Sequence, residues 1–121
     1  GKMINEGMLE KLNFDNIPNM AKIGEQYKGL DYDPNDEYSV PYTWGVVGLV
    51  YNKTMVDEAP TSWDAMWDEK YENSILMFNN SRDAFAIAAK RLGMSLNPST
   101  VEEVETIAEE LKAQKSLVQP T

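Results

Sequence analysis

YSVPYTWGVVGLVYN, residues 38–52, is the stretch of sequence that decides the fold. Aromatic, β-branched and small residues follow one another here without a charge, which predicts an extended and buried segment. Gly45 and Gly48 interrupt this composition, and a glycine inside a strand indicates a bend or the close approach of another backbone. Tyr42, Trp44 and Tyr51 allow two interpretations, packing in a core or part of an aromatic box around a ligand, and their surroundings favour the core.

Helices and a second strand are predicted after this stretch. Thr61, with Asp64 three residues later, is typical of a capping box for a helix at residues 62–68. Trp63 and Trp67 lie on one face of that helix and are expected to pin it to a sheet. The apolar run at residues 75–78 predicts a short, fully buried strand.

Two further helices are predicted toward the C-terminal end. The polar residues 79–81 suit a helix entry, and the helix should run to about Leu92, where Gly93 stops it. Thr100 and Glu103 form a second capping box, and positions 101, 104, 107, 108 and 111 give that last helix a buried stripe. The alternation of strands and helices after residue 38 predicts an α/β fold with some parallel pairing.

The first third of the chain has weaker signals. Residues 2–12 read as an amphipathic helix with a glycine in its middle. Residues 19–28 predict one or two irregular helical turns, and residues 31–37 (DYDPNDE) a polar turn. We expect the chain to be an internal piece of a longer protein, because it opens inside a predicted helix and stops just after the apolar pair Leu117 and Val118. Because residues 1–12 read as an amphipathic helix, we do not expect them to be a signal peptide, and the sequence contains no apolar run near the length that spans a bilayer.

The composition argues against several classes of function. The 121 residues include 20 acids and 11 bases, a formal charge of −9, whereas nucleic-acid binding needs basic patches. Cysteine and histidine are absent from the sequence, which removes thiolate ligands, disulfides and the commonest general base and metal ligand. We therefore expect no metal and no cofactor. The acidity either serves solubility or attracts cationic ligands.

Three segments together carry a family resemblance: residues 38–45, residues 61–75 (TSWDAMWDEKYENSI) and residues 79–93. In this order and spacing they resemble the spermidine/putrescine-binding proteins of polyamine ABC importers, which are extracytoplasmic solute-binding proteins. The resemblance implies an α/β fragment of a two-lobed, periplasmic-binding-protein-like (type II) fold. Residues 1–48 would be the end of the first-lobe segment with the strand that crosses the hinge, and residues 49–121 part of the second lobe.

The resemblance also implies where a ligand binds. The family has an acid at each of two positions, one in the loop after the buried strand and one in the first helical turn. In this sequence the corresponding residues are Asn80 and Asp83. Asp83 keeps a carboxylate that can hold an ammonium group, whereas Asn80 departs from the pattern and brings an acceptor without charge. Each residue also has a structural interpretation, Asp83 as an acid at the positive end of a helix dipole and Asn80 as a helix cap.

The implied function is capture of a polyamine between two lobes outside the cytoplasmic membrane, for delivery to ABC permease subunits and without enzymatic chemistry. Binding of another small cationic or organic solute is the runner-up. A glycoside-type hydrolase with paired acids and a pure interaction module are further alternatives. We also expect the chain to expose an edge of its crossing strand, which favours a dimer or an exchanged strand.

Overall fold

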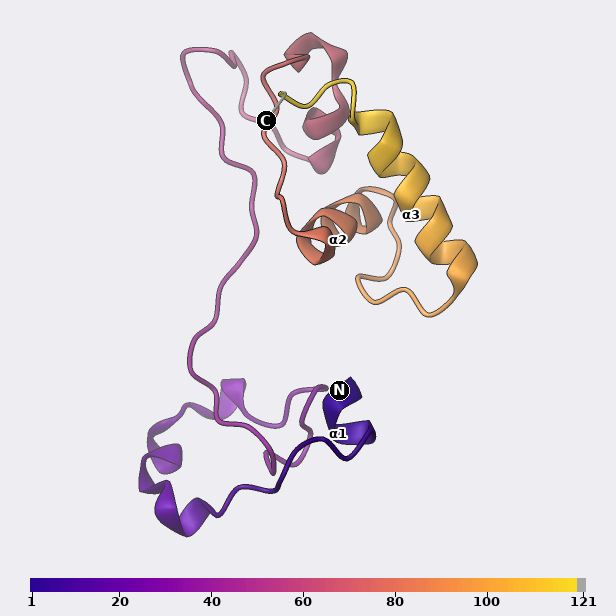
Figure 1. The fold of residues 1–121 in the computed structure, drawn as a ribbon. Helices are drawn as coiled ribbons and strands as arrows, with labels where there is room; N and C mark the ends of the chain where they lie inside the picture. Colours follow the sequence, from indigo (N-terminus) through magenta and orange to yellow (C-terminus); the bar gives the residue numbers. More distant parts are fainter. Residues whose placement is uncertain (120–121) are drawn as a thin grey trace. The chain divides into compact units, whose positions relative to one another are not determined.

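The computed structural model describes residues 1–119 and divides into two compact units, Gly1–Val46 and the residues from Val47 onward. The regular structure consists almost entirely of helices (Figure 1). The first unit holds α1 (Lys2–Asn5) and the 3-10 helices η1 (Phe14–Asn16), η2 (Pro18–Lys22) and η3 (Glu25–Tyr27); the second holds the 3-10 helices η4 (Trp63–Trp67) and η5 (Glu69–Tyr71) and the helices α2 (Ser81–Arg91) and α3 (Val101–Gln114).

Helix α1 is a single turn, so the predicted helix over residues 2–12 is wrong beyond residue 5. Gly7 adopts a left-handed φ of +64°. Its N–H donates to the carbonyl oxygen of Ile4 at 3.0 Å, and the N–H of Met8 donates to the carbonyl oxygen of Met3 at 2.9 Å. This pair of bonds is a Schellman motif, which satisfies the last carbonyls of a helix and turns the chain away. The glycine therefore ends the helix instead of lying within it.

The polar turn predicted at residues 31–37 is present and is organised by Asp33, whose side chain is only 3% exposed. The carboxylate accepts hydrogen bonds from the N–H of Glu37 (3.1 Å), the N–H of Tyr38 (2.9 Å) and the hydroxyl of Ser39 (2.8 Å). Burial, the largest single influence, raises the pKa of Asp33, but these hydrogen bonds together outweigh burial and hold the pKa below its ordinary value.

Helices α2 and α3 confirm the predictions for the C-terminal part of the chain. Helix α2 ends before Gly93, which has a φ of +69°. Helix α3 begins with the predicted capping box, in which the Thr100 hydroxyl accepts from the N–H of Glu103 at 3.2 Å. In return, the backbone N–H groups of Ser99 and Thr100 donate to the Glu103 carboxylate, and they hold the pKa of Glu103 below its usual range.

The core of the second unit lies where α2 packs against α3, the orange and yellow helices of Figure 1. Ala88, Ala89 and Ile107 are fully buried there. Four partly buried side chains surround them: Trp67, Phe85, Met94 and Leu111. The predicted stripe on α3 is therefore buried around its middle, whereas Val101 at its start is 74% exposed.

The predicted long strand over residues 38–52 is not formed. Residues 39–51 make no backbone–backbone hydrogen bond with any residue that the structure describes. The expected burial is also wrong, because Tyr42 is 97% exposed and Trp44 is 68% exposed, with one face of its ring stacked on Tyr27 at 6.4 Å between centroids. A strand needs a partner backbone, which local composition cannot supply.

The second predicted strand, at residues 75–78, is reduced to one isolated parallel bridge between Ile75 and Val118. Ile75 is buried as expected, but Leu76 is 70% exposed and Phe78 is also exposed, so the run is not fully buried. Within residues 1–119 the α/β prediction is therefore not met, although the single bridge has the parallel direction that was expected.

The helix predicted at residues 62–68 is the 3-10 helix η4, and its cap is Ser62 instead of Thr61. The Ser62 hydroxyl accepts from the N–H of Asp64 at 3.2 Å and donates to the Asp64 carboxylate at 3.0 Å. Because a 3-10 turn closes after three residues instead of four, a serine two positions before the acid fits the shorter turn.

Candidate functional site

The two predicted ligand residues lie at the start of α2. Asn80 is the N-cap of the helix, and its side-chain oxygen accepts from the N–H of Arg82 at 2.9 Å and from the N–H of Asp83 at 3.4 Å. The structural interpretation of Asn80 as a cap is thus confirmed. Both lone pairs of the amide oxygen point toward helix N–H groups, so a ligand contact through this oxygen has to compete with the cap.

Asp83 lies in the first turn of α2 with a half-buried side chain. Its carboxylate forms no hydrogen bond and no ion pair with any residue in the described range 1–119. The neighbouring Arg82 is exposed and likewise has no ion pair within that range. An aspartate that is partly removed from water without a cation beside it is suited to accept one from outside.

A larger cluster of polar contacts lies at the other end of α2, around Arg91, whose side chain is 26% exposed. The guanidinium Nε lies 3.0 Å from a carboxylate oxygen of Asp64, and Nη1 pairs with the carboxylate of Glu110. The guanidinium also lies 4.8 Å from the centre of the Trp67 ring, a cation–π contact. Arg91 therefore joins η4, α2 and α3 through one side chain.

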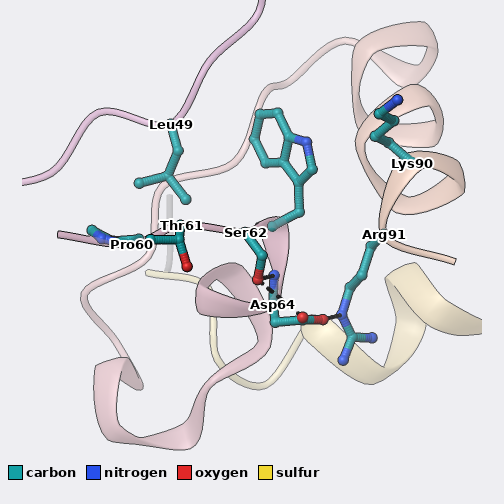
Figure 2. Close-up of a pocket in the computed structure, with 8 residues that line it drawn as sticks. Leu49, Pro60, Thr61, Ser62, Asp64, Lys90 and Arg91 are labelled. Carbon is teal, nitrogen blue, oxygen red and sulfur yellow. Dashed lines mark hydrogen bonds and ion pairs between the residues drawn. The ribbon is translucent and has the colours of Figure 1, made fainter. Parts of the chain in front are cut away.

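Figure 2 shows the hollow beside this cluster, where the Asp64 carboxylate and the Arg91 guanidinium point toward each other. The hollow has a volume of about 520 Å³. Its lining comes from the segment before and within η4 and from the end of α2: Leu49, Pro60, Thr61, Ser62, Trp63, Asp64, Lys90 and Arg91.

The sequence did not reveal the Arg91 cluster, because its partners are 24 to 27 positions away or lie on another helix. Trp67 is half-buried, and its indole N–H donates to the carbonyl oxygen of Glu110 at 3.0 Å. Trp67 therefore joins η4 to α3, and the predicted partner, a sheet, is wrong. The only sequence signal was a basic residue in the last turn of a predicted helix, which also suits the helix dipole.

Among residues 1–119 no group of three or more acidic side chains is arranged to hold a metal ion. None of the described helices combines the length and apolar character that crossing a bilayer requires.

Comparison with known proteins identifies the family of this chain. The family model for bacterial extracellular solute-binding proteins matches residues 1–120. The chain belongs to this family. The match confirms the family predicted from the sequence and its extracytoplasmic setting.

Several similar proteins carry spermidine and putrescine in their names. The spermidine/putrescine-binding periplasmic protein of Salmonella typhimurium is 36% identical over 92% of this chain and 32% of its own length. The protein of the same name from Escherichia coli K12 is 34% identical over the same shares. The spermidine/putrescine ABC transporter substrate-binding protein PotD from Streptococcus pneumoniae has a solved structure that matches with a TM-score of 0.77 and 36% identity, over 98% of this chain and 36% of that chain.

These likenesses show that the chain is built like part of a periplasmic-binding-protein fold. The chain spans about a third of the length of the curated relatives it matches.

Proposed function

We propose that the protein carrying this chain is the solute-binding component of an ABC importer and that it captures spermidine or putrescine. The names of the relatives support the ligand class. The observation in this chain that carries the proposal is the half-buried Asp83 carboxylate, which lacks a cation among the described residues. ABC permease subunits would be the partners that receive the ligand.

In this proposal the ligand lies between two lobes, with residues 1–48 and 49–121 contributing to different lobes of an α/β, type II binding-protein fold. Each ammonium of a polyamine leaves water only where carboxylates or carbonyls replace its hydration. Asp83 accepts such an ammonium. Asn80 is the second ligand contact. Its amide oxygen binds an ammonium only if it releases one of the helix N–H groups that it caps.

The function is binding and release, without covalent chemistry. Membership of a solute-binding family supports this, and so does the absence of histidine and cysteine from the sequence. A polyamine recovered unchanged after long incubation with the protein would agree with this view, and any turnover product would contradict it.

The decisive test is titration calorimetry of the full-length protein with spermidine, putrescine and a neutral sugar. Replacing Asp83 by alanine should weaken polyamine binding by about 1.5–3 kcal/mol, the range for hydrogen bonds to a charged group. This corresponds to roughly a 10- to 150-fold higher Kd.

Glu102→Gln is the matched control, because Glu102 is an exposed acid in the first turn of the other long helix, α3. If both substitutions weaken binding equally, the effect is general electrostatics and Asp83 is not a contact. Equal heats for the sugar and the polyamines would remove the polyamine assignment. Binding of a different small organic cation in preference to both polyamines would favour the runner-up function.

A further inference from the structure

The buried Asp33 is followed by Pro34, and theirs is the one Asp–Pro bond in the sequence. An aspartate can cleave its own peptide bond, because its side-chain oxygen reaches the main-chain carbonyl carbon through a five-membered ring. A following proline favours this reaction, because its nitrogen belongs to a tertiary amide and leaves readily once it takes a proton. This pair of residues therefore carries the chemistry of a self-cleaving bond.

The reaction needs only a proton and water from the solvent. One carboxylate oxygen of Asp33 forms a bond to its own carbonyl carbon, and the C–N bond to Pro34 breaks. The Pro34 nitrogen keeps the electron pair of that bond and takes a proton from the solvent. The product is a cyclic anhydride, which water opens to leave two carboxyl groups on Asp33 and a new chain that begins at Pro34.

The folded turn holds the attacking group away from this reaction. The carbonyl oxygen of Asp33 accepts from the N–H of Asp36 at 3.0 Å, which polarises the carbonyl that would be attacked. The carboxylate, in contrast, is held by three donors: the N–H groups of Glu37 and Tyr38 and the hydroxyl of Ser39. Turning toward its own carbonyl would take the carboxylate from these donors and leave partly buried N–H groups without an acceptor.

The peptide bond itself is open to solvent on its leaving-group side, because Pro34 is exposed although Asp33 is buried. Protection of the bond therefore comes from the hydrogen bonds to the carboxylate and not from exclusion of water. The charged neighbours in the turn are engaged elsewhere. The Asp36 carboxylate accepts from the N–H of Gly29, and the Glu37 carboxylate pairs with Lys11 at 2.6 Å.

We propose that the Asp33–Pro34 bond is a latent self-cleavage site, which the folded turn at residues 31–37 keeps inactive and which opening of the turn activates. Cleavage there separates α1 and the three 3-10 helices of the first unit from the stretch that leads into the second unit. Every group that takes part lies within the first unit. The site acts without a polyamine ligand.

The test is prolonged incubation of the full-length protein, with and without urea, at the lowest pH at which the turn remains folded. Hydrogen exchange at the amides of Glu37 and Tyr38 reports whether the turn is closed, and mass spectrometry detects the fragment that ends at Asp33. We expect cleavage in urea and at least about tenfold less without it, the equivalent of one hydrogen bond to a charged group. Equal cleavage in both solutions would overturn the proposal, and so would an intact bond in urea.

Ser39→Ala tests the hydrogen bonds that protect the site. Without urea, loss of this donor should speed cleavage about tenfold. Hydrogen exchange at Glu37 and Tyr38 should rise by the same factor, because both processes use the open turn. Ser95→Ala, which changes an exposed serine of the second unit, is the matched control and should alter neither rate. Unchanged cleavage in Ser39→Ala, or faster exchange without faster cleavage, would overturn the proposal.

Pro34→Ala tests the chemistry of the bond. The proline ring is exposed and its nitrogen donates no hydrogen bond, so the three donors to Asp33 stay in place. The variant keeps the carboxylate but replaces the tertiary amide by a secondary one. Cleavage in urea should therefore nearly disappear, and cleavage at the unaltered rate would show that attack by Asp33 is not the reaction.

Discussion

At Asp33 three hydrogen bonds converge on a carboxylate that is almost removed from water. Because they favour the charged form, the pKa of Asp33 in the folded protein lies below the ordinary value of 3.8. The stabilisation is fully present above that ordinary value. It is lost as the pH falls through the lower, folded-state pKa.

Replacing Asp33 by asparagine should therefore destabilise the first unit at pH 7 and make less difference near pH 3. Below pH 3.8 the carboxyl group is protonated in the unfolded chain, so part of the stability that the charged form supplies is already lost near pH 3 and the two proteins become more alike. Urea unfolding followed by the fluorescence of Trp44, the one tryptophan of that unit, measures the difference at each pH. A gap in stability of the same size at both pH values would contradict the assignment.

Arg91 is a single side chain that joins several elements. Replacing it by methionine should lower the free energy of unfolding of the second unit by about 2 kcal/mol, because hydrogen bonds to charged groups are lost. Glu110, whose side chain is only 20% exposed, would lose its cation. Arg91→Lys should recover only part of the loss, because an ammonium cannot replace a planar guanidinium that contacts two carboxylates and a ring.

Lys90→Met is the matched control for Arg91. Lys90 is the neighbouring exposed base and forms no ion pair with residues 1–119. Its replacement should change stability by less than about 0.5 kcal/mol. Equal losses for the two methionine variants in urea unfolding would mean that the Arg91 contacts contribute nothing specific.

Among the elements, α3 depends on its capping box. Thr100→Ala removes the acceptor for the N–H of Glu103 and should cost about 1 kcal/mol. Thr106→Ala makes the same chemical change in the exposed middle of α3 and should be neutral or slightly stabilising, because alanine is the better helix former. Thermal unfolding compares the two, and an equal loss would argue against a special role for the cap.

The elements that were predicted correctly are those whose signals are local. A capping residue, a stripe of apolar residues and a terminal glycine all lie within or directly beside the helix they define, as in α2 and α3. The predicted strands did not form because a strand is completed by a distant backbone, and within residues 1–119 only Ile75 pairs with one, at Val118. The Asn80 cap could be predicted from sequence, whereas the Arg91 cluster could not, because three separate elements meet there.

For the whole molecule, the family was identified from three short segments and confirmed by a match over residues 1–120. The same segments led to Asp83, which the structure leaves without a cation among the described residues and which the calorimetric test now addresses. The division into two units at residues 46 and 47 comes from the coordinates. The assignment of residues 1–48 and 49–121 to two lobes remains a prediction about the longer protein.

The contacts between η4 and α3 have a mechanical consequence. The Trp67 indole donates to a carbonyl on α3, and the Gln114 amide of α3 donates back to the carbonyl oxygen of Met66 at 2.7 Å. Because both bonds join the same two elements, a shift of α3 by one residue, about 1.5 Å along its axis, would strain both at once. We therefore expect η4 and α3 to move as one rigid body in any motion of the second unit.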